Sequence, residues 1–113
     1  MARRKNRTFT EVELEFMRII WDLGEATPED IAEELAGKKR ALSGGSIRNV
    51  LAVMLEKGYI SRRKESRAFL YRAKVHEEEA RRGMVHDLLE HVFEGSESSL
   101  VSSLLDRREI HQE

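Results

Sequence analysis

The sequence predicts a mainly α-helical fold with one small β-hairpin, that is, an α+β winged helix-turn-helix domain followed by a C-terminal helical segment. Apolar residues recur at helical spacing in three segments of the N-terminal part, and then at the strand-like spacing of two over residues 59–74. The stretch from Lys38 to Lys74 carries eleven Lys or Arg and only two acids, a net charge of +9. A basic helix that leads into a basic hairpin is typical of winged-helix DNA binding.

The length and composition exclude several classes of protein. With 113 residues, the chain can form one domain, or one small domain with an appendage. It has no cysteine, which excludes disulfides and thiolate metal or redox sites and fits a cytoplasmic location. No run of about 18 apolar residues occurs, so insertion into a membrane is not expected.

The formal net charge of −1 arises from two parts of opposite charge. Residues 1–75 carry 16 basic and 11 acidic side chains, whereas residues 76–113 carry 4 basic and 10 acidic ones. This asymmetry indicates that the first part meets a polyanion and the second does not. We therefore expect a flexible basic arm over residues 1–8, a winged-helix DNA-binding domain over residues 9–75 and a helical dimerisation region over residues 76–113.

Two helices are expected before the basic stretch. Thr10 and Glu13 have the spacing of a capping box at the start of the first helix, and Gly24 is expected to end that helix. Thr27 is the expected N-cap of the second helix, with Pro28 at its first position. Each helix carries an apolar face, which predicts that the two helices pack against a common core.

The third helix, with Ser43 as its expected N-cap, has two different faces. Its inward stripe is expected to consist of Ile47, Val50, Leu51, Met54 and Leu55. The outward face is expected to consist of Ser46, Arg48, Asn49, Ala52 and Val53. Small and polar groups with few charges suit the base edges of the major groove, where Asn binds adenine, Arg binds guanine and apolar carbon contacts the thymine methyl. Gly44 and Gly45 lower helix propensity but would let the N-terminus of the helix approach a phosphate closely.

The hairpin over residues 59–74 is expected to supply further contacts with DNA. We expect Ile60 to pair with Phe69 or Tyr71 on an inner face. The mobile cations are expected to be Arg62, Lys64, Arg67 and Arg72. A basic hairpin can also be a solvated sheet edge that its charges protect, but its position directly after the outward helix face favours contact with DNA. The residues expected to bind DNA are therefore Ser43, Gly45, Ser46, Arg48, Asn49, Val53, Arg62, Lys64 and Arg67.

The acidic C-terminal part is expected to form two amphipathic helices separated by Gly95 and Ser96. The apolar stripes of these helices lie too far from the core of the N-terminal domain to be buried entirely by it. Apolar stripes without cover predict self-association into a homodimer. The residues expected at the dimer interface are Met84, Val85, Leu88, Leu89, Val92, Phe93, Leu100, Val101, Leu104 and Leu105. Residues 106–113 are expected to fray.

An enzyme, a metal site and a bound cofactor are all poorly supported by the sequence. His86 and Glu90 are four residues apart, a spacing that could hold a metal, but spacing places no third ligand beside them. No glycine-rich phosphate loop follows a strand, and no Ser, His and Asp are arranged for nucleophilic catalysis. We therefore expect no catalytic residues, no metal ligands and no cofactor.

Three segments together resemble the penicillinase-repressor family, which includes the methicillin-resistance and copper-operon repressors. The segment FTEVELEFMRIIWDLG resembles the first helix of that family, with Thr10, Glu13 and Trp21 at matching places. The segment SIRNVLAVMLEKGYISRRKESRAFLYRAK resembles its recognition helix, Lys-Gly corner and wing, including Phe69 and Tyr71. The segment VFEGSESSLVSSLL resembles its dimerisation segment.

The resemblance implies a homodimeric transcriptional repressor whose winged helices bind a palindromic operator in double-stranded DNA. It aligns Ser46, Arg48 and Asn49 with the base-reading turn of the family, and Lys64 and Arg67 with its wing. In the beta-lactam branch, a membrane sensor protease triggers cleavage in the C-terminal part, which implies derepression by proteolysis. In the copper branch, C-terminal cysteines bind the metal, and this chain has no cysteine.

Two other uses of the same fold remain open. A winged helix can serve as a protein-docking module without specific DNA binding, since a fold does not dictate a function. Such a module is not expected to concentrate a net charge of +9 on its third helix and hairpin. A DNA-binding ligand sensor would need an apolar cavity between two lobes, and the sequence offers no spare aromatic-lined segment for one.

Overall fold

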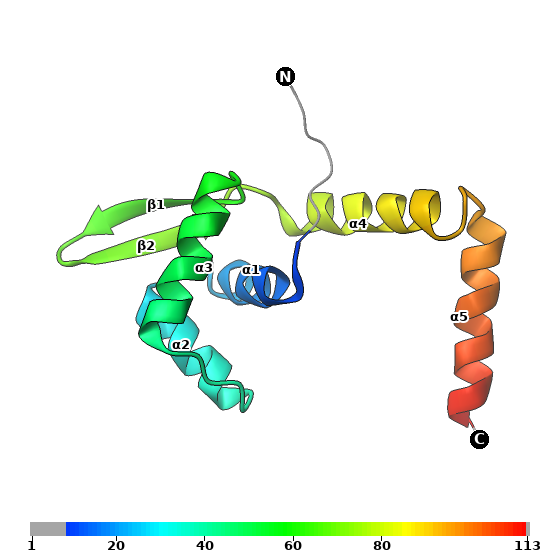
Figure 1. Ribbon diagram of the computed structural model, residues 1–113, viewed down its shortest axis with the longest axis horizontal. Coiled ribbons are helices and arrows are strands. Elements are labelled where there is room, and N and C mark those ends of the chain that lie inside the picture. Colours follow the sequence, from blue (N-terminus) through cyan, green and yellow to red (C-terminus); the bar gives the residue numbers. More distant parts are fainter. Residues whose placement is uncertain (1–8, 113) are drawn as a thin grey trace. The chain divides into compact units, whose positions relative to one another are not determined.

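The structure is a computed structural model that describes residues 9–112, with side chains described over residues 9–107. The expected basic arm, residues 1–8, therefore lies outside the described residues. The elements follow in the order α1 (Glu11–Leu23), α2 (Pro28–Gly37), α3 (Gly44–Glu56), β1 (Ile60–Glu65), β2 (Ala68–Ala73), α4 (Glu77–His91) and α5 (Glu97–Gln112) (Figure 1). The expected fold class, mainly α-helical with one hairpin, is confirmed. Phe9–Glu77 forms one compact unit, and the residues from Glu78 onward belong to a second.

Side-chain caps explain where α1 and α2 begin. The Thr10 hydroxyl accepts from the Glu13 N–H at 3.1 Å, and the Glu13 carboxylate accepts from the Thr10 N–H at 3.0 Å. Thr27 and Asp30 form a second capping box of the same kind at the start of α2. Each box satisfies backbone donors that a helix N-terminus leaves without an intrahelical partner. Gly24 caps the C-terminus of α1 with a φ of +87°, a conformation that favours glycine.

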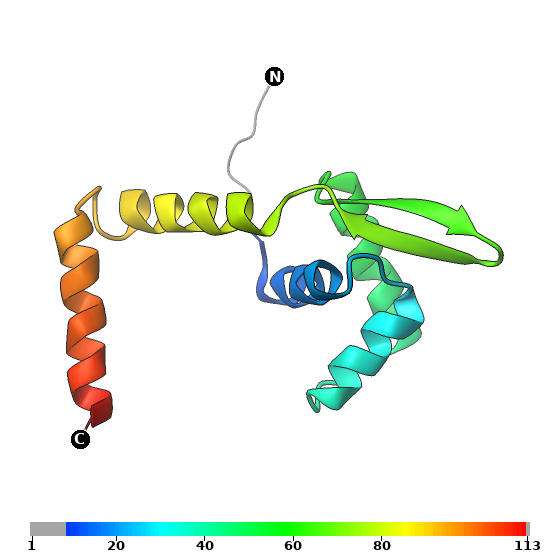
Figure 2. The same cartoon turned by 180° about the vertical axis from the view of Figure 1, so that it is seen from behind.

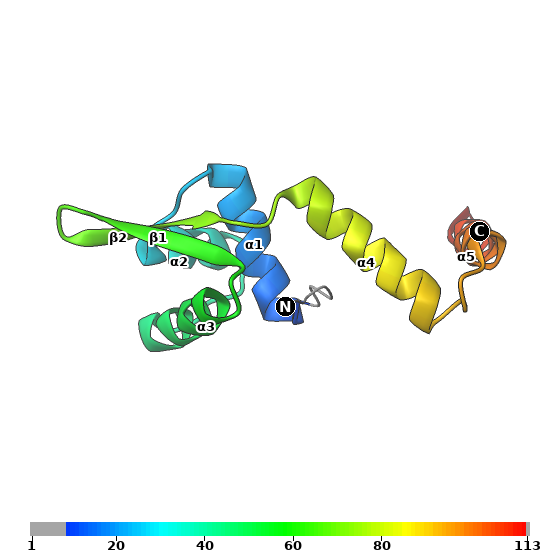
Figure 3. The ribbon, with the colours of Figure 1, turned by 90° about the horizontal axis from the view of Figure 1, so that it is seen from above.

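The core of the first unit lies where α1, α2, α3 and the hairpin meet (Figure 2). Its largest fully buried side chains are Phe16, Met17, Ile20, Ile31, Leu35, Ile47, Leu51, Met54, Ile60 and Val75. Apolar side chains from all three helices thus meet in one core. Beyond this core, the hairpin extends away from α1 (Figure 3).

The register of the hairpin differs from the expected one. Ile60 pairs with Ala73, whereas Phe69 pairs with Lys64 and Tyr71 with Arg62. The expected pairing of Ile60 with Phe69 or Tyr71 was therefore wrong, because a two-residue turn places Glu65 opposite Ala68. The error was an even number of residues, and side chains alternate between the two faces of a strand. Phe69 and Tyr71 consequently still share a face with Ile60.

One residue of the connection between α1 and α2 pairs with the hairpin. Ala26 donates to the Tyr71 carbonyl at 3.0 Å, and Tyr71 donates to the Ala26 carbonyl at 2.8 Å. Both residues are buried. This antiparallel bridge fixes β2 against the helices, so the base of the hairpin is held by hydrogen bonds as well as by the core.

A buried carboxylate connects the start of α1 to the end of α3. Glu13 is 4% exposed, and one of its oxygens accepts from Lys57 Nζ at 2.8 Å. Burial alone would raise the pKa of Glu13, but the hydrogen bonds from Lys57 and from the Thr10 N–H outweigh burial and lower it. The charged form of Glu13 therefore stabilises the placement of α3 relative to α1.

Replacing Glu13 with glutamine should lower the free energy of unfolding by about 1 kcal/mol at neutral pH, because Lys57 loses a charged acceptor. Since folding lowers the pKa of Glu13, its contribution is present above the unfolded-state value and is lost as the pH falls through the folded-state value. The difference between wild type and variant should thus shrink in acid. Urea unfolding followed by the fluorescence of Trp21, the one tryptophan of the chain, measures this difference stepwise from about pH 7 downward. An equal difference at all pH values would contradict the assignment.

The second unit contains most of α4 and all of α5. Gly95, with a φ of +83°, and Ser96 separate the two helices as expected, and the Ser96 hydroxyl accepts from the Ser99 N–H at 3.2 Å. The expected fraying over residues 106–113 was wrong for most of that range, because α5 continues to Gln112. No helix among the described residues is long and apolar enough to cross a membrane.

Candidate nucleic-acid interface

The N-terminus of α3 is open to solvent and is organised by two serines. Ser43 is the N-cap, as expected, and its hydroxyl accepts from the Ser46 N–H at 3.1 Å. The same hydroxyl lies 3.1 Å from Ser46 Oγ and donates to it. A Cβ atom at Gly45 would meet only Ser43 Oγ, at 4.0 Å, whereas a Cβ atom at Gly44 would lie 3.3 Å from Arg48 Nη1. The Arg48 side chain therefore reaches back to the first residue of α3.

The two faces of α3 are those expected from the sequence. Ile47, Leu51 and Met54 are buried, and Val50 and Leu55 are half-buried. The outward residues Ser46, Arg48, Asn49, Ala52 and Val53 are all exposed. These five outward residues are polar or small apolar groups with one positive charge, a chemistry that suits base edges.

The hairpin presents cations on both of its faces. Those on one face contact an aromatic ring, and a cation on the other face pairs with carboxylates. On the face shared with Tyr71, the Arg62 guanidinium lies 4.1 Å from the centre of the Phe69 ring, and Arg62 Nη1 donates to the Tyr71 hydroxyl at 3.4 Å. Lys64 Nζ lies 5.7 Å from the centre of the same ring. Arg62 was expected to be a mobile cation, but these contacts hold its guanidinium against the hairpin.

On the other face, Arg63 anchors the hairpin to the helices. Its Nε and Nη2 atoms each donate to a different oxygen of Glu25 at 3.0 Å, and its Nη1 donates to Glu65. The hydrogen bond from Arg63 lowers the pKa of Glu25, and the hydrogen bond from Glu25 raises the pKa of Arg63. No local pattern indicates this pair, because Glu25 and Arg63 are separated by 38 positions in the chain. Arg63 thus has its carboxylate partners within the protein.

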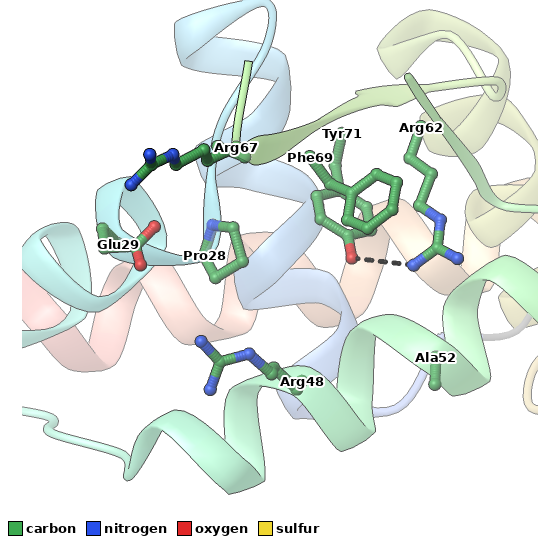
Figure 4. Close-up of a pocket in the computed structure, with 9 residues that line it drawn as sticks. Pro28, Glu29, Arg48, Ala52, Arg62, Arg67, Phe69 and Tyr71 are labelled. Atoms are coloured by element: carbon green, nitrogen blue, oxygen red, sulfur yellow. Dashed lines mark hydrogen bonds between the residues drawn. The ribbon is translucent and has the colours of Figure 1, made fainter. Parts of the chain in front are cut away.

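A hollow of about 310 Å³ lies between α3, the start of α2 and the hairpin (Figure 4). It is lined by Pro28, Glu29, Arg48, Ala52, Arg62, Arg67, Ala68, Phe69 and Tyr71. In Figure 4, Arg48 belongs to α3, whereas Arg62 and Arg67 belong to the hairpin, and the dashed line marks the Arg62–Tyr71 hydrogen bond. The hollow therefore brings one arginine of α3 and two arginines of the hairpin to one surface, with Glu29 as the acid among its lining residues.

All nine residues expected to bind DNA are exposed and lie in the first unit. Those on α3 or at its N-cap are Ser43, Gly45, Ser46, Arg48, Asn49 and Val53, and those on the hairpin are Arg62, Lys64 and Arg67. The hollow joins Arg48 of the first group to Arg62 and Arg67 of the second. Glu29, Phe69 and Tyr71 lie at the same surface, although no pattern in the sequence indicates a functional role for them.

The ten residues expected at a dimer interface lie on or next to α4 and α5. Six of them are exposed large apolar side chains, namely Val85, Leu88, Val92, Val101, Leu104 and Leu105. The other four, Met84, Leu89, Phe93 and Leu100, are half-buried. Among the described residues, no group of three or more His, Cys, Asp or Glu side chains could hold a metal ion.

Comparisons with known proteins agree with this arrangement. A family model described as penicillinase repressor matches residues 9–113. The methicillin resistance regulatory protein MecI of Staphylococcus aureus is 29% identical over 110 residues, which cover 96% of this chain and 89% of that protein. The penicillinase repressor of Bacillus licheniformis is 26% identical over 110 residues, which cover 97% and 85% of the respective chains.

A further relative and a solved structure are also similar to this chain. A 16.5 kDa protein of Latilactobacillus sakei is 31% identical over 112 residues, which cover 99% of this chain and 75% of that protein. The solution structure of the DNA-binding domain of the repressor BlaI has a TM-score of 0.57 and 27% sequence identity, and the match covers 68% of this chain and 93% of that domain. The sequence matches thus extend over both units, and the structural match identifies a fold that is used for DNA binding.

Proposed function

Because the chain belongs to the penicillinase repressor family, we propose that it represses transcription as a homodimer bound to a palindromic operator. Family membership makes the chain a DNA-binding transcriptional repressor and not an enzyme. The observation that carries the proposal is the exposed face of α3, which holds Ser46, Arg48 and Asn49 beside a hairpin with exposed cations.

In this proposal, α3 lies in the major groove and reads the bases. The Asn49 amide can both donate to and accept from the edge of adenine, and the Arg48 guanidinium can bind guanine O6 and N7. The Val53 side chain offers apolar carbon to a thymine methyl. Ser43, Gly45 and the N-terminus of α3 would approach a phosphate, which their exposure allows and the helix dipole favours.

The hairpin supplies affinity in the proposed complex. Lys64 and Arg67 are exposed, and contacts from such cations to phosphates release counterions and so make binding depend on salt. Arg63 is not among the proposed contacts, because it is engaged by Glu25 and Glu65. The hairpin therefore contributes affinity through Lys64 and Arg67, while Arg63 holds the hairpin against the helices.

Dimerisation through α4 and α5 would join two such units. The exposed apolar side chains of these helices support this step, since a surface of this kind is stabilised when a second copy covers it. Two recognition helices about 34 Å apart, or a multiple of this distance, would face successive turns of the same groove. The operator should accordingly be a palindrome with half-sites one turn or more apart.

Derepression would follow from any event that breaks the dimer. The linked binding of two half-sites is lost when the units separate, so each unit would hold its half-site only weakly. We propose proteolysis in the C-terminal part, triggered by a membrane sensor protease in a response to beta-lactams, as this event. The methicillin-resistance and penicillinase regulators among the relatives support this choice of signal.

Fluorescence-anisotropy titration against a library of short duplexes, at two salt concentrations, tests the proposed function. The expected result is that the tightest-binding duplex is a palindrome, and that it binds one dimer about a thousandfold more tightly than random DNA does. Weak binding that ignores sequence and disappears with added salt would contradict it. The protein-docking use of the fold would then be the better explanation of the basic surface.

A further inference from the structure

The hollow between α3 and the hairpin concentrates positive charge that the protein itself does not neutralise. Arg48, Arg62 and Arg67 line it, and Glu29 is the acid that lines it with them. Among the described residues, none of these three arginines forms an ion pair. Arginine presents a planar fork of donors that matches the oxygens of a phosphate group. The lining of the hollow is therefore suited to an anion from outside the protein.

One of the three guanidinium groups is already held in place. The Phe69 ring lies 4.1 Å from the Arg62 guanidinium, and the Tyr71 hydroxyl accepts from Arg62 Nη1 at 3.4 Å. Tyr71 is in turn 5% exposed and is fixed to Ala26 by two backbone hydrogen bonds. A side chain that is held before binding loses less conformational freedom when the ligand arrives.

The geometry of double-stranded DNA indicates which anion would occupy the hollow. One sugar-phosphate strand separates each major groove from the neighbouring minor groove. If α3 lies in the major groove and the hairpin reaches past its edge, that strand crosses between the two elements. The hollow between α3 and the hairpin is then where a backbone phosphate lies.

We propose that this hollow binds one phosphate of the DNA backbone, and that Phe69 is the positioning residue that holds Arg62 for it. The inference rests on the proposed binding of α3 in the major groove. It assigns to Phe69 a role that is exercised through Arg62. It also assigns a role to Glu29, whose carboxylate opposes the entry of a phosphate.

A double-mutant cycle on operator affinity tests the role of Phe69. Phe69→Leu should weaken operator binding about threefold, because leucine keeps an apolar side chain but offers no ring to the guanidinium. Arg62→Ala should weaken binding about tenfold and lower the salt slope by about 0.9 for each bound protomer, the change expected when each protomer loses one phosphate contact. In the Arg62→Ala background, Phe69→Leu should have almost no further effect.

Phe69→Tyr is the conservative control, because its ring keeps the contact with Arg62, and it should bind the operator as wild type does. Circular dichroism and urea unfolding establish that each variant is folded. Equal losses from Phe69→Leu in both backgrounds, or an unchanged salt slope in Arg62→Ala, would overturn the inference. If Phe69→Leu fails to fold, the salt slope of Arg62→Ala and the Glu29 variant test the phosphate in the hollow.

Glu29→Gln also tests whether a phosphate binds in the hollow, but this variant is expected to bind DNA more tightly, not more weakly. Removing this charge should tighten binding about threefold on the operator and on random DNA alike, because the carboxylate no longer repels a phosphate. Glu33→Gln on the same helix is the matched control, since Glu33 is exposed but does not line the hollow. Glu29→Gln with unchanged or weakened binding would count against a phosphate in the hollow. If wild type binds no duplex specifically, the proposed function fails first; if it does and the cycle is additive, only the inference fails.

Discussion

Replacing Leu88 and Val92 with aspartate should yield folded monomers that bind the operator at least about a hundredfold more weakly than wild type. These side chains are 39% and 62% exposed, and the Val92 N–H donates to the Leu88 carbonyl at 2.9 Å, so the two lie one helical turn apart. Because both are exposed in the single chain, charges there should not unfold it. In a dimer that buries them, two unpaired carboxylates in each chain would be strongly unfavourable.

The loss of affinity has a simple origin in the proposed mechanism. When two half-sites are joined through one dimer, binding of the second unit is intramolecular and gains an effective concentration. A monomer keeps every contact of α3 and the hairpin but loses this gain. Affinity for an isolated half-site should therefore stay as it is, while affinity for the whole palindrome falls.

A matched variant separates the loss of dimerisation from a general effect of negative charge. Gly83→Asp with His86→Asp also adds two carboxylates to α4, and a Cβ at Gly83 would meet no atom within 4 Å. Sedimentation velocity should show a dimer for this control and a monomer for the Leu88 and Val92 variant. Tight binding of the whole palindrome by proven monomers would refute the dimer mechanism, and a dimeric Leu88 and Val92 variant would remove these residues from the interface.

Local patterns in the sequence were sufficient for much of the fold. The Thr10–Glu13 capping box and the Ser43 cap involve residues three positions apart, so their spacing alone predicts the hydrogen bonds that the structure contains. The same holds for the division of α3 into a buried and an exposed face, because helical periodicity fixes which side chains share a face. Gly24 and Gly95 marked the ends of segments for the same local reason.

Contacts between distant parts of the chain were not predictable in this way. The Arg63–Glu25 pair and the bridge between Ala26 and Tyr71 depend on how the hairpin docks against the helices, which no local pattern specifies. The register of Ile60 depends on where the two-residue turn lies, and a basic stretch with several turn-compatible positions does not fix that. The alternation of side chains along β1 puts Arg62 on the same face as Ile60. That alternation could not reveal that the Arg62 guanidinium lies against the Phe69 ring.

Asn49→Ala should weaken operator binding by about 1–3 kcal/mol and relax the preference for one base pair in each half-site. Asn49 is exposed on the outward face of α3, between the N-cap and the wing-side residue Ala52. An amide that donates to and accepts from one base edge distinguishes that base, whereas alanine leaves both base atoms without partners in the interface. The same variant should bind random DNA almost as wild type does, because it removes no charge.

Lys64→Ala is the control that gives the opposite pattern. Lys64 is exposed on the hairpin, and its removal should weaken all sequences alike and lower the salt slope by about one unit for each bound protomer. Titrations of both variants against the operator, its single-base substitutions and random DNA compare the two patterns directly. If Asn49→Ala weakens random DNA as much as the operator, Asn49 does not read a base, and the discrimination must come from Arg48 or from the shape of the DNA. A loss of affinity that is confined to the operator and depends on one base pair would instead identify the base pair that Asn49 contacts.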